Sequence, residues 1–344
     1  MKDVGPILIR GTNWIGDSVM SLAALRELRR LYPKCHISLL VTPWVLGLFE
    51  GQGLVDKIIP FQSSGSTWQD LRSLRKQLRH FQTVVLFQNA FRAAAIAFFS
   101  GIPERIGYAT DGRSLLLTRR ARPRIKKLKR HQTYHYLDLL YQTGLSSHNY
   151  LKETTFIPDI HLDISQKGSK HIDELLQASG PSSGGPLVVI NPGAYYGTAK
   201  RWFIDRYAVL ADRLIDDIKA EIVLVGSPEE IPLAQKIQAL SKHPLKVLTG
   251  QTDLQSLMSL LSRCDLFVTN DSGPMHLAAS LDTPQIALFG STDEVATGPF
   301  SARAHVLHKH VECSPCLLRE CPIDLRCFSK ITVDEVYNAA RAIL

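Results

Sequence analysis

Short apolar runs that alternate with helix-like segments constrain the fold of this chain more than any other feature. The runs PILIR and TVVLFQ each have the length of a buried strand, and each precedes a segment with apolar residues at helical spacing. A succession of strands and helices of this kind produces a parallel sheet that is covered by helices on both faces. The chain is therefore expected to be an α/β protein.

The alternation occurs a second time after the polar segment SGPSSGGP at residues 179–186. The later apolar runs are LVVINPG, EIVLVG, DLFVTND and QIALFG, with helix-like segments between them. A Gly/Ser/Pro-rich stretch between two patterned regions is typical of a linker. We therefore predict two Rossmann-like, doubly wound domains, residues 1–178 and 187–344, which face each other across a cleft at the carboxyl ends of both sheets.

The bulk composition favours a cytoplasmic globular protein. The chain has 344 residues, of which 45% are hydrophobic, yet it lacks an apolar run of the ~20 residues that span a bilayer. Its first residues do not have the pattern of a secretory signal peptide. The six cysteines are not spaced like a secreted disulfide framework.

The net charge of +8 favours acidic partners, and much of it comes from the segment RRARPRIKKLKRH at residues 119–131. Two interpretations of this segment stay open. It is either a solvated basic face or a patch that meets an anionic ligand or lipid head groups.

The segment LFVTNDSGPMHLAAS runs from an apolar strand directly into a helix-like stretch. The first amides of a helix lack partners within it, so Ser272 and Gly273 can donate backbone N–H groups to a phosphate. His276, one turn later, could add another donor, and Asp271 could accept from backbone amides or from a ligand hydroxyl. An ordinary helix cap with a core histidine is the alternative.

A second loop, GTNWIGDSV at residues 11–19, follows the first apolar run. It lacks the G-x-G-x-x-G fingerprint, so a nicotinamide site is poorly supported. Asp17 stands at the start of the next helix. It could act as a general base toward a hydroxyl nucleophile, or it could simply complement the helix dipole.

Two further strand ends carry charged residues. In INPGAYYGTAKRW, Lys200 and Arg201 are cations beside an expected phosphate site, where a diphosphate leaving group needs positive charge. In VGSPEE, Glu229 and Glu230 could accept hydrogen bonds from ribose hydroxyls, although a helix cap explains them as well.

Three segments together resemble a known family: GTNWIGDSVMSLAALRELRRLYP, NPGAYYGTAKRW and TNDSGPMHLAASLDTPQIALFGSTD. They are similar to the bacterial lipopolysaccharide heptosyltransferases of glycosyltransferase family nine, with the heptosyltransferase II branch as the nearest match. The resemblance runs over nearly the whole chain. It implies a GT-B fold with an N-terminal acceptor-binding domain and a C-terminal domain that binds the ADP-sugar.

The resemblance also assigns roles to residues of this sequence. Asp17 corresponds to the proposed catalytic base, and Lys200 corresponds to the lysine that neutralises the donor phosphates. Either Glu229 or Glu230 can be aligned with the ribose ligand, and we prefer Glu230. The residues that match the donor-binding set are Glu230, Asp271, Ser272, Gly273 and His276.

The implied reaction moves L-glycero-D-manno-heptose from ADP-heptose to the heptose–Kdo–lipid A inner core, with inversion at the anomeric carbon. Neither a cofactor nor a metal is expected, because the expected cleft loops contain no D-x-D carboxylate pair. Peripheral contact with the cytoplasmic face of the inner membrane is expected, and nucleic acid is not expected as a partner.

Two other functions remain possible at this level. The chain could be a GT-B transferase with a different nucleotide sugar or core acceptor, or a non-catalytic module that binds a glycolipid or a nucleotide. A separate question concerns Cys313, Cys316, Cys321 and Cys327, which could hold structural zinc or remain free or packing thiols.

Overall fold

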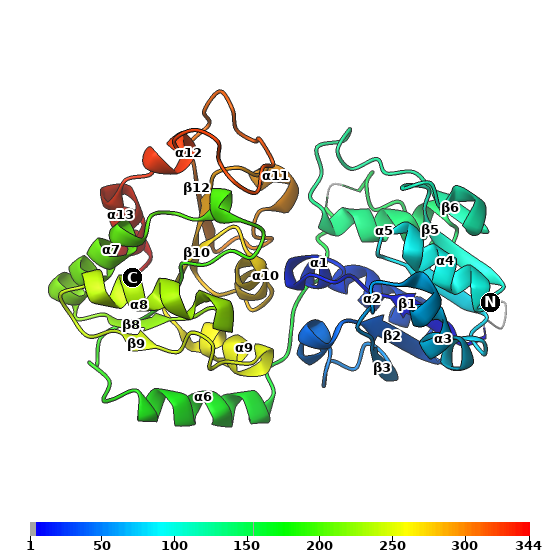
Figure 1. Cartoon of the computed structure of the whole chain (residues 1–344), viewed down its shortest axis with the longest axis horizontal. Helices are drawn as coiled ribbons and strands as arrows, with labels where there is room; N and C mark the ends of the chain where they lie inside the picture. Colours follow the sequence, from blue (N-terminus) through cyan, green and yellow to red (C-terminus); the bar gives the residue numbers. More distant parts are fainter. Residues whose placement is uncertain (1–4, 154) are drawn as a thin grey trace. The chain divides into compact units, whose positions relative to one another are not determined.

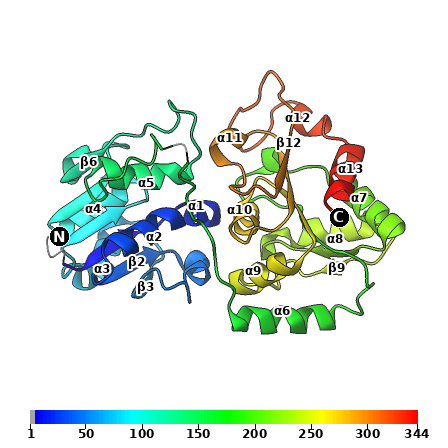
Figure 2. The same ribbon diagram turned by 180° about the vertical axis from the view of Figure 1, so that it is seen from behind.

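The computed structural model describes residues 5–153 and 155–344, which form two compact units divided between Ile160 and His161. Figures 1 and 2 show that each unit contains its own sheet with helices on both faces. No helix formed by these described residues is long and apolar enough to cross a membrane.

The first unit contains a six-stranded parallel sheet in the order β3-β2-β1-β4-β5-β6. Ile7, Leu8 and Ile9 of its central strand are at most 1% exposed, which explains why this run is continuously apolar rather than alternating. The strands are β1 (Ile7–Arg10), β2 (Ile37–Val41), β3 (Lys57–Pro60), β4 (Thr83–Leu86), β5 (Glu104–Tyr108) and β6 (Arg119–Ala121).

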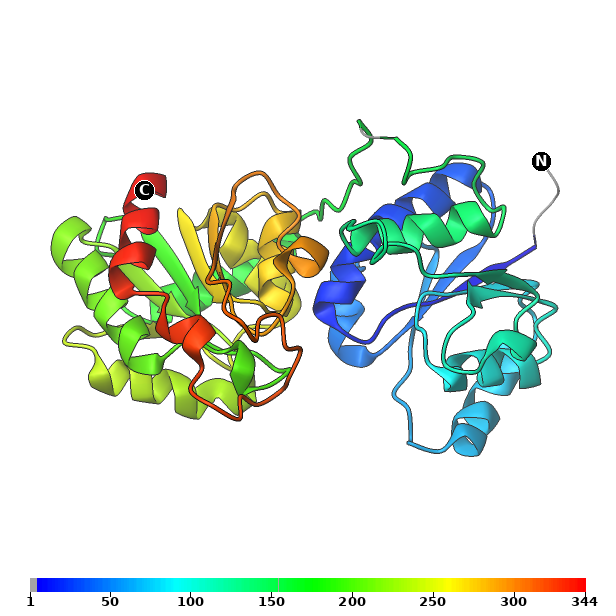
Figure 3. The same ribbon diagram turned by 90° about the horizontal axis from the view of Figure 1, so that it is seen from above.

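Helices cover this sheet in two groups. The helix α2 packs against α5, and α3 packs against α4 on the other face, as Figure 3 shows. The α2 helix turns Leu22, Leu25 and Leu28 inward, as its helical spacing predicts. The helical segments are α1 (Ile15–Met20), α2 (Leu22–Leu31), η1 (Pro43–Leu48), α3 (Thr67–Leu78), α4 (Phe91–Phe99), η2 (Ser114–Leu116) and α5 (Thr133–Gln142).

The second unit repeats the topology with the strand order β12-β11-β10-β7-β8-β9, again all parallel. Counted from its own first strand, this is the same 3-2-1-4-5-6 order as in the first unit. The strands are β7 (Leu187–Asn191), β8 (Glu221–Leu224), β9 (Lys246–Val247), β10 (Leu266–Asn270), β11 (Gln285–Phe289) and β12 (Ala304–His308).

The helices of the second unit also form two layers, with α7 against α8 and α13, and α9 against α6 and α10. Trp202, Tyr207 and Phe328 are large, fully buried members of its core. The helical segments are α6 (Gln166–Ala178), η3 (Thr198–Lys200), α7 (Ile204–Ile218), η4 (Pro228–Glu230), α8 (Ile231–Leu240), α9 (Leu254–Arg263), α10 (Gly273–Ser280), α11 (Glu294–Thr297), α12 (Arg326–Ser329) and α13 (Val333–Ile343).

The structural division of the chain comes earlier than the expected boundary at residues 179–186. The helix α6, which we expected in the first domain, packs closely on α9 of the second unit. A Cβ at Gly168 would lie 2.4 Å from the Gln255 carbonyl oxygen, so this glycine permits the contact. The polar segment is therefore a loop between α6 and β7 and not the link between the units.

Candidate active site

Each sheet has a topological switch point, between β1 and β4 in the first unit and between β7 and β10 in the second. In doubly wound sheets, ligands bind outside the carboxyl ends of the strands at such points. The residues predicted to act on substrates follow β1, β7, β8 and β10. The topology therefore places the predicted residues where each sheet is expected to bind a ligand.

The loop after β7 is held in place by Asn270, the last residue of β10. The Asn270 side-chain oxygen accepts hydrogen bonds from the Trp202 amide (3.1 Å) and the Tyr207 hydroxyl (2.9 Å). Its amide nitrogen donates to the Pro192 carbonyl at 2.8 Å. Because Asn270 is fully buried and its polar atoms are satisfied, it fixes residues 192–202 over the end of β10.

Lys200 and Asp271 form an ion pair at this position. Lys200 Nζ lies 2.6 Å from Asp271 Oδ2, and the two side chains are only 15% and 5% exposed. The Thr292 hydroxyl donates to the same carboxylate oxygen at 2.5 Å, and the Tyr196 ring lies 5.0 Å from Nζ. We expected Asp271 to accept from backbone amides or from a ligand hydroxyl. The Lys200 ammonium and the Thr292 hydroxyl both contact Oδ2, so Asp271 holds the Lys200 ammonium in position. Its contact with a ligand hydroxyl stays a prediction.

The N-terminus of α10 lies directly after Asp271. In the described part of the chain, Ser272 makes no side-chain capping bond to the helix; its hydroxyl accepts from Asn191 Nδ2 at 2.9 Å and lies 3.2 Å from Thr269 Oγ1. An ordinary serine cap is therefore not what the structure contains. The first amides of a helix have no partner within it and carry the positive end of the helix dipole, which suits an anion at Ser272 and Gly273.

His276 lies on α10 one turn after Ser272, and it is 5% exposed. This burial fits a histidine packed in the core. It also fits a histidine that reaches a ligand as a hydrogen-bond donor after a small local movement. Its role toward the sugar nucleotide stays a prediction.

Glu230, and not Glu229, is brought to the strand ends. A Cβ at Gly193 would lie 1.8 Å from Glu230 Oε1, and one at Gly226 would lie 2.7 Å from Oε2. The Glu230 carboxylate thus lies against the backbone after both β7 and β8, and it accepts from the Ser227 amide at 2.8 Å. Glu229 is exposed. Glu230 also closes a capping box, and its role as the ribose ligand stays a prediction.

In the first unit, Asp17 occupies the first turn of α1 and is partly exposed. The Tyr136 hydroxyl, from α5, donates to Asp17 Oδ1 at 3.4 Å. Burial raises the pKa of Tyr136 well above its ordinary value, and the charge of Asp17 raises it further. The phenol therefore stays protonated at neutral pH. Toward the Asp17 carboxylate it acts only as a hydrogen-bond donor.

A cavity of about 430 Å³ opens beside the same switch point. Arg10 is 7% exposed there, and burial lowers the pKa of its guanidinium to about 10. Its nitrogens donate to the Gly11 and Leu40 carbonyls and to Asn13 Oδ1. Residues that line the cavity include Arg10, Asn13, Trp44, Gln62, Gln88 and Arg92.

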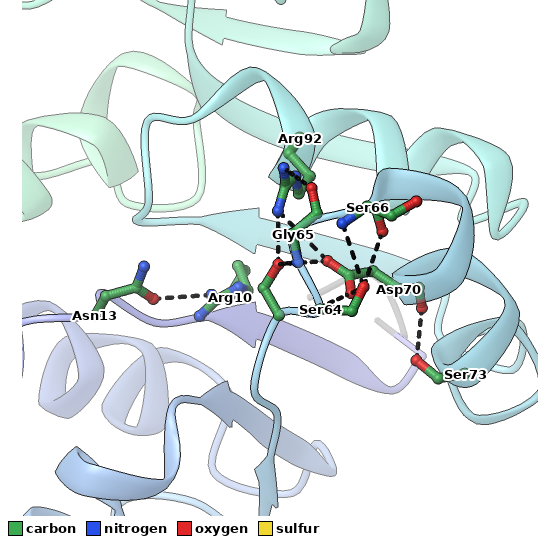
Figure 4. A network of polar contacts seen from close by, with 9 residues as sticks. Arg10, Asn13, Ser64, Gly65, Ser66, Asp70, Ser73 and Arg92 are labelled. Atoms are coloured by element: carbon green, nitrogen blue, oxygen red, sulfur yellow. Dashed lines mark hydrogen bonds and ion pairs between the residues drawn. The ribbon is translucent and has the colours of Figure 1, made fainter.

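Arg92 approaches this cavity from α4 and is held by a polar network that Figure 4 shows. It donates to Ser63 Oγ (2.6 Å) and to the Gly65 carbonyl (2.5 Å), and it lies 3.7 Å from Asp70. Burial alone would raise the pKa of Asp70, but hydrogen bonds from Ser63 and Ser64 and the charge of Arg92 lower it. Sequence reasoning missed both arginines, because only the fold brings Arg10 at the end of β1 and Arg92 at the start of α4 to one cavity.

The cysteine-rich segment lies against the loop that contains Lys200. The Ala199 amide donates to the Arg319 carbonyl (3.0 Å), and the Tyr196 hydroxyl donates to the Leu317 carbonyl (3.1 Å). Within residues 5–153 and 155–344, no three of the four thiol sulfurs lie within 4.8 Å of one another. Cys327 is buried, Cys316 and Cys321 are partly exposed, and Cys313 is exposed.

Two Rossmann-ordered sheets on a single chain, each with polar loops at its switch point, are the architecture of a GT-B glycosyltransferase. The sequence agrees with that class. The model of glycosyltransferase family 9 (heptosyltransferase) matches residues 71–326, and the chain belongs to this family.

Individual relatives support the same assignment. The lipopolysaccharide heptosyltransferase 2 of Salmonella typhimurium is 32% identical over 310 residues, covering 88% of this chain and 87% of that protein. The solved structure of E. coli ADP-heptose lps heptosyltransferase II superposes with a TM-score of 0.81 at 27% identity, covering 98% of both chains. A family 9 glycosyltransferase from Veillonella parvula, at 22% identity, shares the fold with a TM-score of 0.82 over 98% of this chain and 97% of that one. The predicted GT-B class is confirmed, whereas the expected cleft between the domains stays a prediction.

Proposed function

We propose that this glycosyltransferase moves L-glycero-D-manno-heptose from ADP-heptose to the heptose–Kdo–lipid A inner core of lipopolysaccharide, with inversion. The names of its relatives supply the sugar and the pathway. The observation that carries the chemistry is the restrained Lys200 ammonium beside the N-terminus of α10. These groups suit a nucleoside diphosphate that must leave with an additional negative charge.

In this proposal the second unit binds the donor. The amides of Ser272 and Gly273 and the Lys200 ammonium bind the diphosphate, and Glu230 accepts hydrogen bonds from the ribose hydroxyls. His276 contributes a further donor from α10. Asp271 acts through Lys200, because its carboxylate is already engaged by Lys200 and Thr292.

The first unit supplies the base and the acceptor site. Asp17 takes the proton from an acceptor hydroxyl as that oxygen attacks the anomeric carbon, and the bond to ADP breaks through an oxocarbenium-like state. Because the nucleophile enters opposite the leaving group, the configuration inverts. Lys200 and the helix amides stabilise the departing diphosphate, so this scheme requires neither a cofactor nor a metal at the donor phosphates.

The cavity lined by Arg10 and Arg92 suits an anionic acceptor. Arg10 and Arg92 bring two guanidinium groups to its lining, and guanidinium pairs well with carboxylates and phosphates. The sugar acids and phosphates of a lipid A inner core belong to these chemical classes. These groups support an acceptor site in the first unit.

Peripheral contact with the cytoplasmic face of the inner membrane forms part of the proposal. Trp68, Phe98 and Phe99 form an exposed aromatic cluster on α3 and α4, with the Arg105 guanidinium 5.1 Å from the Phe98 ring. Aromatic side chains flanked by cations suit the head-group region of an anionic membrane. Flotation with anionic vesicles should capture the wild type, less of Trp68→Ala, and an undiminished amount of the control Leu240→Ala, an exposed residue of α8.

The central experiment incubates the purified protein with ADP-heptose and a heptose-bearing Kdo–lipid A acceptor, with and without EDTA. Acceptor mass and ADP release are followed together, and UDP- and GDP-sugars serve as competing donors. A gain of one heptose that survives EDTA is the expected result. ADP release without acceptor gain, or preference for another sugar nucleotide, would contradict the proposed donor and acceptor and favour a different GT-B transferase.

A further inference from the structure

Three potential metal ligands meet where β12 ends and α11 begins. The ligand-type atoms of Glu294, His308 and His310 all lie within 4.8 Å of one another. His308 Nδ1 is 2.7 Å from Glu294 Oε2, and His310 Nε2 is 3.5 Å from Glu294 Oε1. Each carboxylate oxygen thus faces one imidazole. None of these residues has a part in the proposed sugar transfer.

The hydrogen bonds of Ser314 determine which nitrogen of His308 is protonated. The Ser314 hydroxyl donates its one hydrogen to the Gly290 carbonyl at 2.6 Å. The same oxygen lies 2.8 Å from His308 Nε2, so it must accept a hydrogen bond from that nitrogen. A neutral His308 consequently turns the lone pair of Nδ1 toward a carboxylate oxygen. This nitrogen thus offers a lone pair, as a metal ligand must, 2.7 Å from a carboxylate oxygen.

The site is rigid on one side and open on the other. The His308 side chain is 4% exposed and belongs to β12, which pairs with β11. Glu294, at 23%, opens α11, whose preceding residue Asp293 caps it by accepting from two helix amides. His310 is 73% exposed. Two ligands are therefore held by secondary structure, and the third leaves a path for entry from solvent.

We propose that Glu294, His308 and His310 form a binding site for a divalent transition metal of the zinc class. Two imidazoles and a carboxylate are a common zinc donor set. Ligand bonds of 2.0–2.2 Å in a tetrahedron place donor atoms roughly 3.3 Å apart. The 3.5 Å separation fits, and the 2.7 Å separation requires an opening of about half an ångström. The His308–Ser314–Gly290 chain is the outer-shell support that orients a metal-bound imidazole.

The consequence of metal binding would be structural. The metal would join α11 to the end of β12. Ser314 in turn connects His308 to the Gly290 carbonyl by hydrogen bonds, and Gly290 stands two residues before Thr292. The Thr292 hydroxyl in turn holds Asp271. A bound metal is therefore expected to raise the melting temperature, and metal binding can be measured whether or not the protein transfers heptose.

The test measures binding of Zn²⁺ to EDTA-stripped, desalted protein in competition with a chromogenic chelator. One equivalent should bind to the wild type. His310→Ala, which changes an exposed loop side chain, should weaken that binding by at least about 100-fold, as should Glu294→Gln. His305→Ala is the matched control, because His305 is exposed on the same strand and lies outside the cluster.

Substitution with Co²⁺ identifies the donor atoms. Weak d–d bands without a thiolate charge-transfer band are the expected spectrum. A thiolate band, or equal Zn²⁺ affinity in the wild type and His310→Ala, would overturn the proposal in favour of the cysteines at residues 313–327. If the wild type binds no Zn²⁺ at micromolar concentrations, the proposal also fails.

Discussion

Replacement of Lys200 by Ala is the most informative single perturbation, because the structure shows what remains when the ammonium is removed. About one unit of negative charge develops on ADP as its bond to the sugar breaks. At a separation of about 4 Å and an effective dielectric constant of about 20, one ammonium stabilises that charge by ~4 kcal/mol. The expected loss in kcat is therefore about a thousandfold, near the upper end for one removed electrostatic contact.

Asp271 makes this prediction sharper. Its carboxylate lies 2.6 Å from the ammonium. If the carboxylate, the ammonium and the developing charge lie in line, the carboxylate is ~6.6 Å from that charge and opposes departure by ~2.5 kcal/mol. Removal of both charges should then cost only ~1.5 kcal/mol, or roughly tenfold in kcat. The double variant Lys200→Ala/Asp271→Asn is thus expected to be more active than Lys200→Ala alone.

The assay is steady-state ADP release at saturating acceptor, with acceptor mass as a second readout. Circular dichroism melts control for folding, since removing one partner of a buried ion pair also destabilises the protein by about 3–5 kcal/mol. The reasoning is refuted if Lys200→Ala retains more than a tenth of wild-type kcat, or if the double variant is no better than the single one.

Three further predictions follow from individual contacts. Asp17→Asn should lower kcat by about 10²–10⁴ while calorimetry shows unchanged ADP-heptose binding, and weakened donor binding would speak against a role as base. Gly193→Ala should raise KM for the donor more than it lowers kcat, because the new Cβ would lie 1.8 Å from Glu230 Oε1 and would push the carboxylate away. An unchanged KM would contradict a role for Glu230 at the ribose. Asp70→Asn should cost about 1–3 kcal/mol of unfolding free energy at neutral pH, because an amide cannot accept every hydrogen bond that the buried carboxylate accepts. Since the folded pKa of Asp70 lies below 3.8, this contribution to stability is complete above pH 3.8 and is lost as the pH falls through the folded pKa. Melting temperatures of the wild type and the variant, measured against pH, test this. A difference in melting temperature that does not shrink in acid would contradict it.

Much of the fold was accessible from the sequence, since strand-length apolar runs and helical periodicity are local properties of the chain. Residues 7–9 illustrate this, because a continuous apolar run indicates burial on both faces of a sheet. The domain boundary was less accessible. The segment 179–186 is polar because it is a surface loop, and composition cannot tell a loop within a unit from a link between units.

The residues of the candidate site also fall into two groups, those that the sequence could identify and those that it could not. Lys200, Ser272 and Gly273 could be singled out because they follow strand-length runs at positions where doubly wound sheets bind ligands. Arg10 could not, since one arginine at the end of an apolar run does not reveal that a cavity opens beside it. The spacing of Asp271 likewise suggested a contact with amides or with ligand, whereas its partners Lys200 and Thr292 come from other strand ends.

The sequence by itself determined the α/β class, the two successive Rossmann patterns and the family, because each depends on local order and on residue identity along the chain. Tertiary structure alone decided that α6 belongs to the second unit, that Asn270 secures the loop of Lys200, and that Glu294 meets two histidines. The physical reason is that hydrogen bonds and ion pairs depend on distances between atoms in space. Parallel strands bring together loops that lie tens of residues apart in the chain, and no local pattern encodes which side chains meet there.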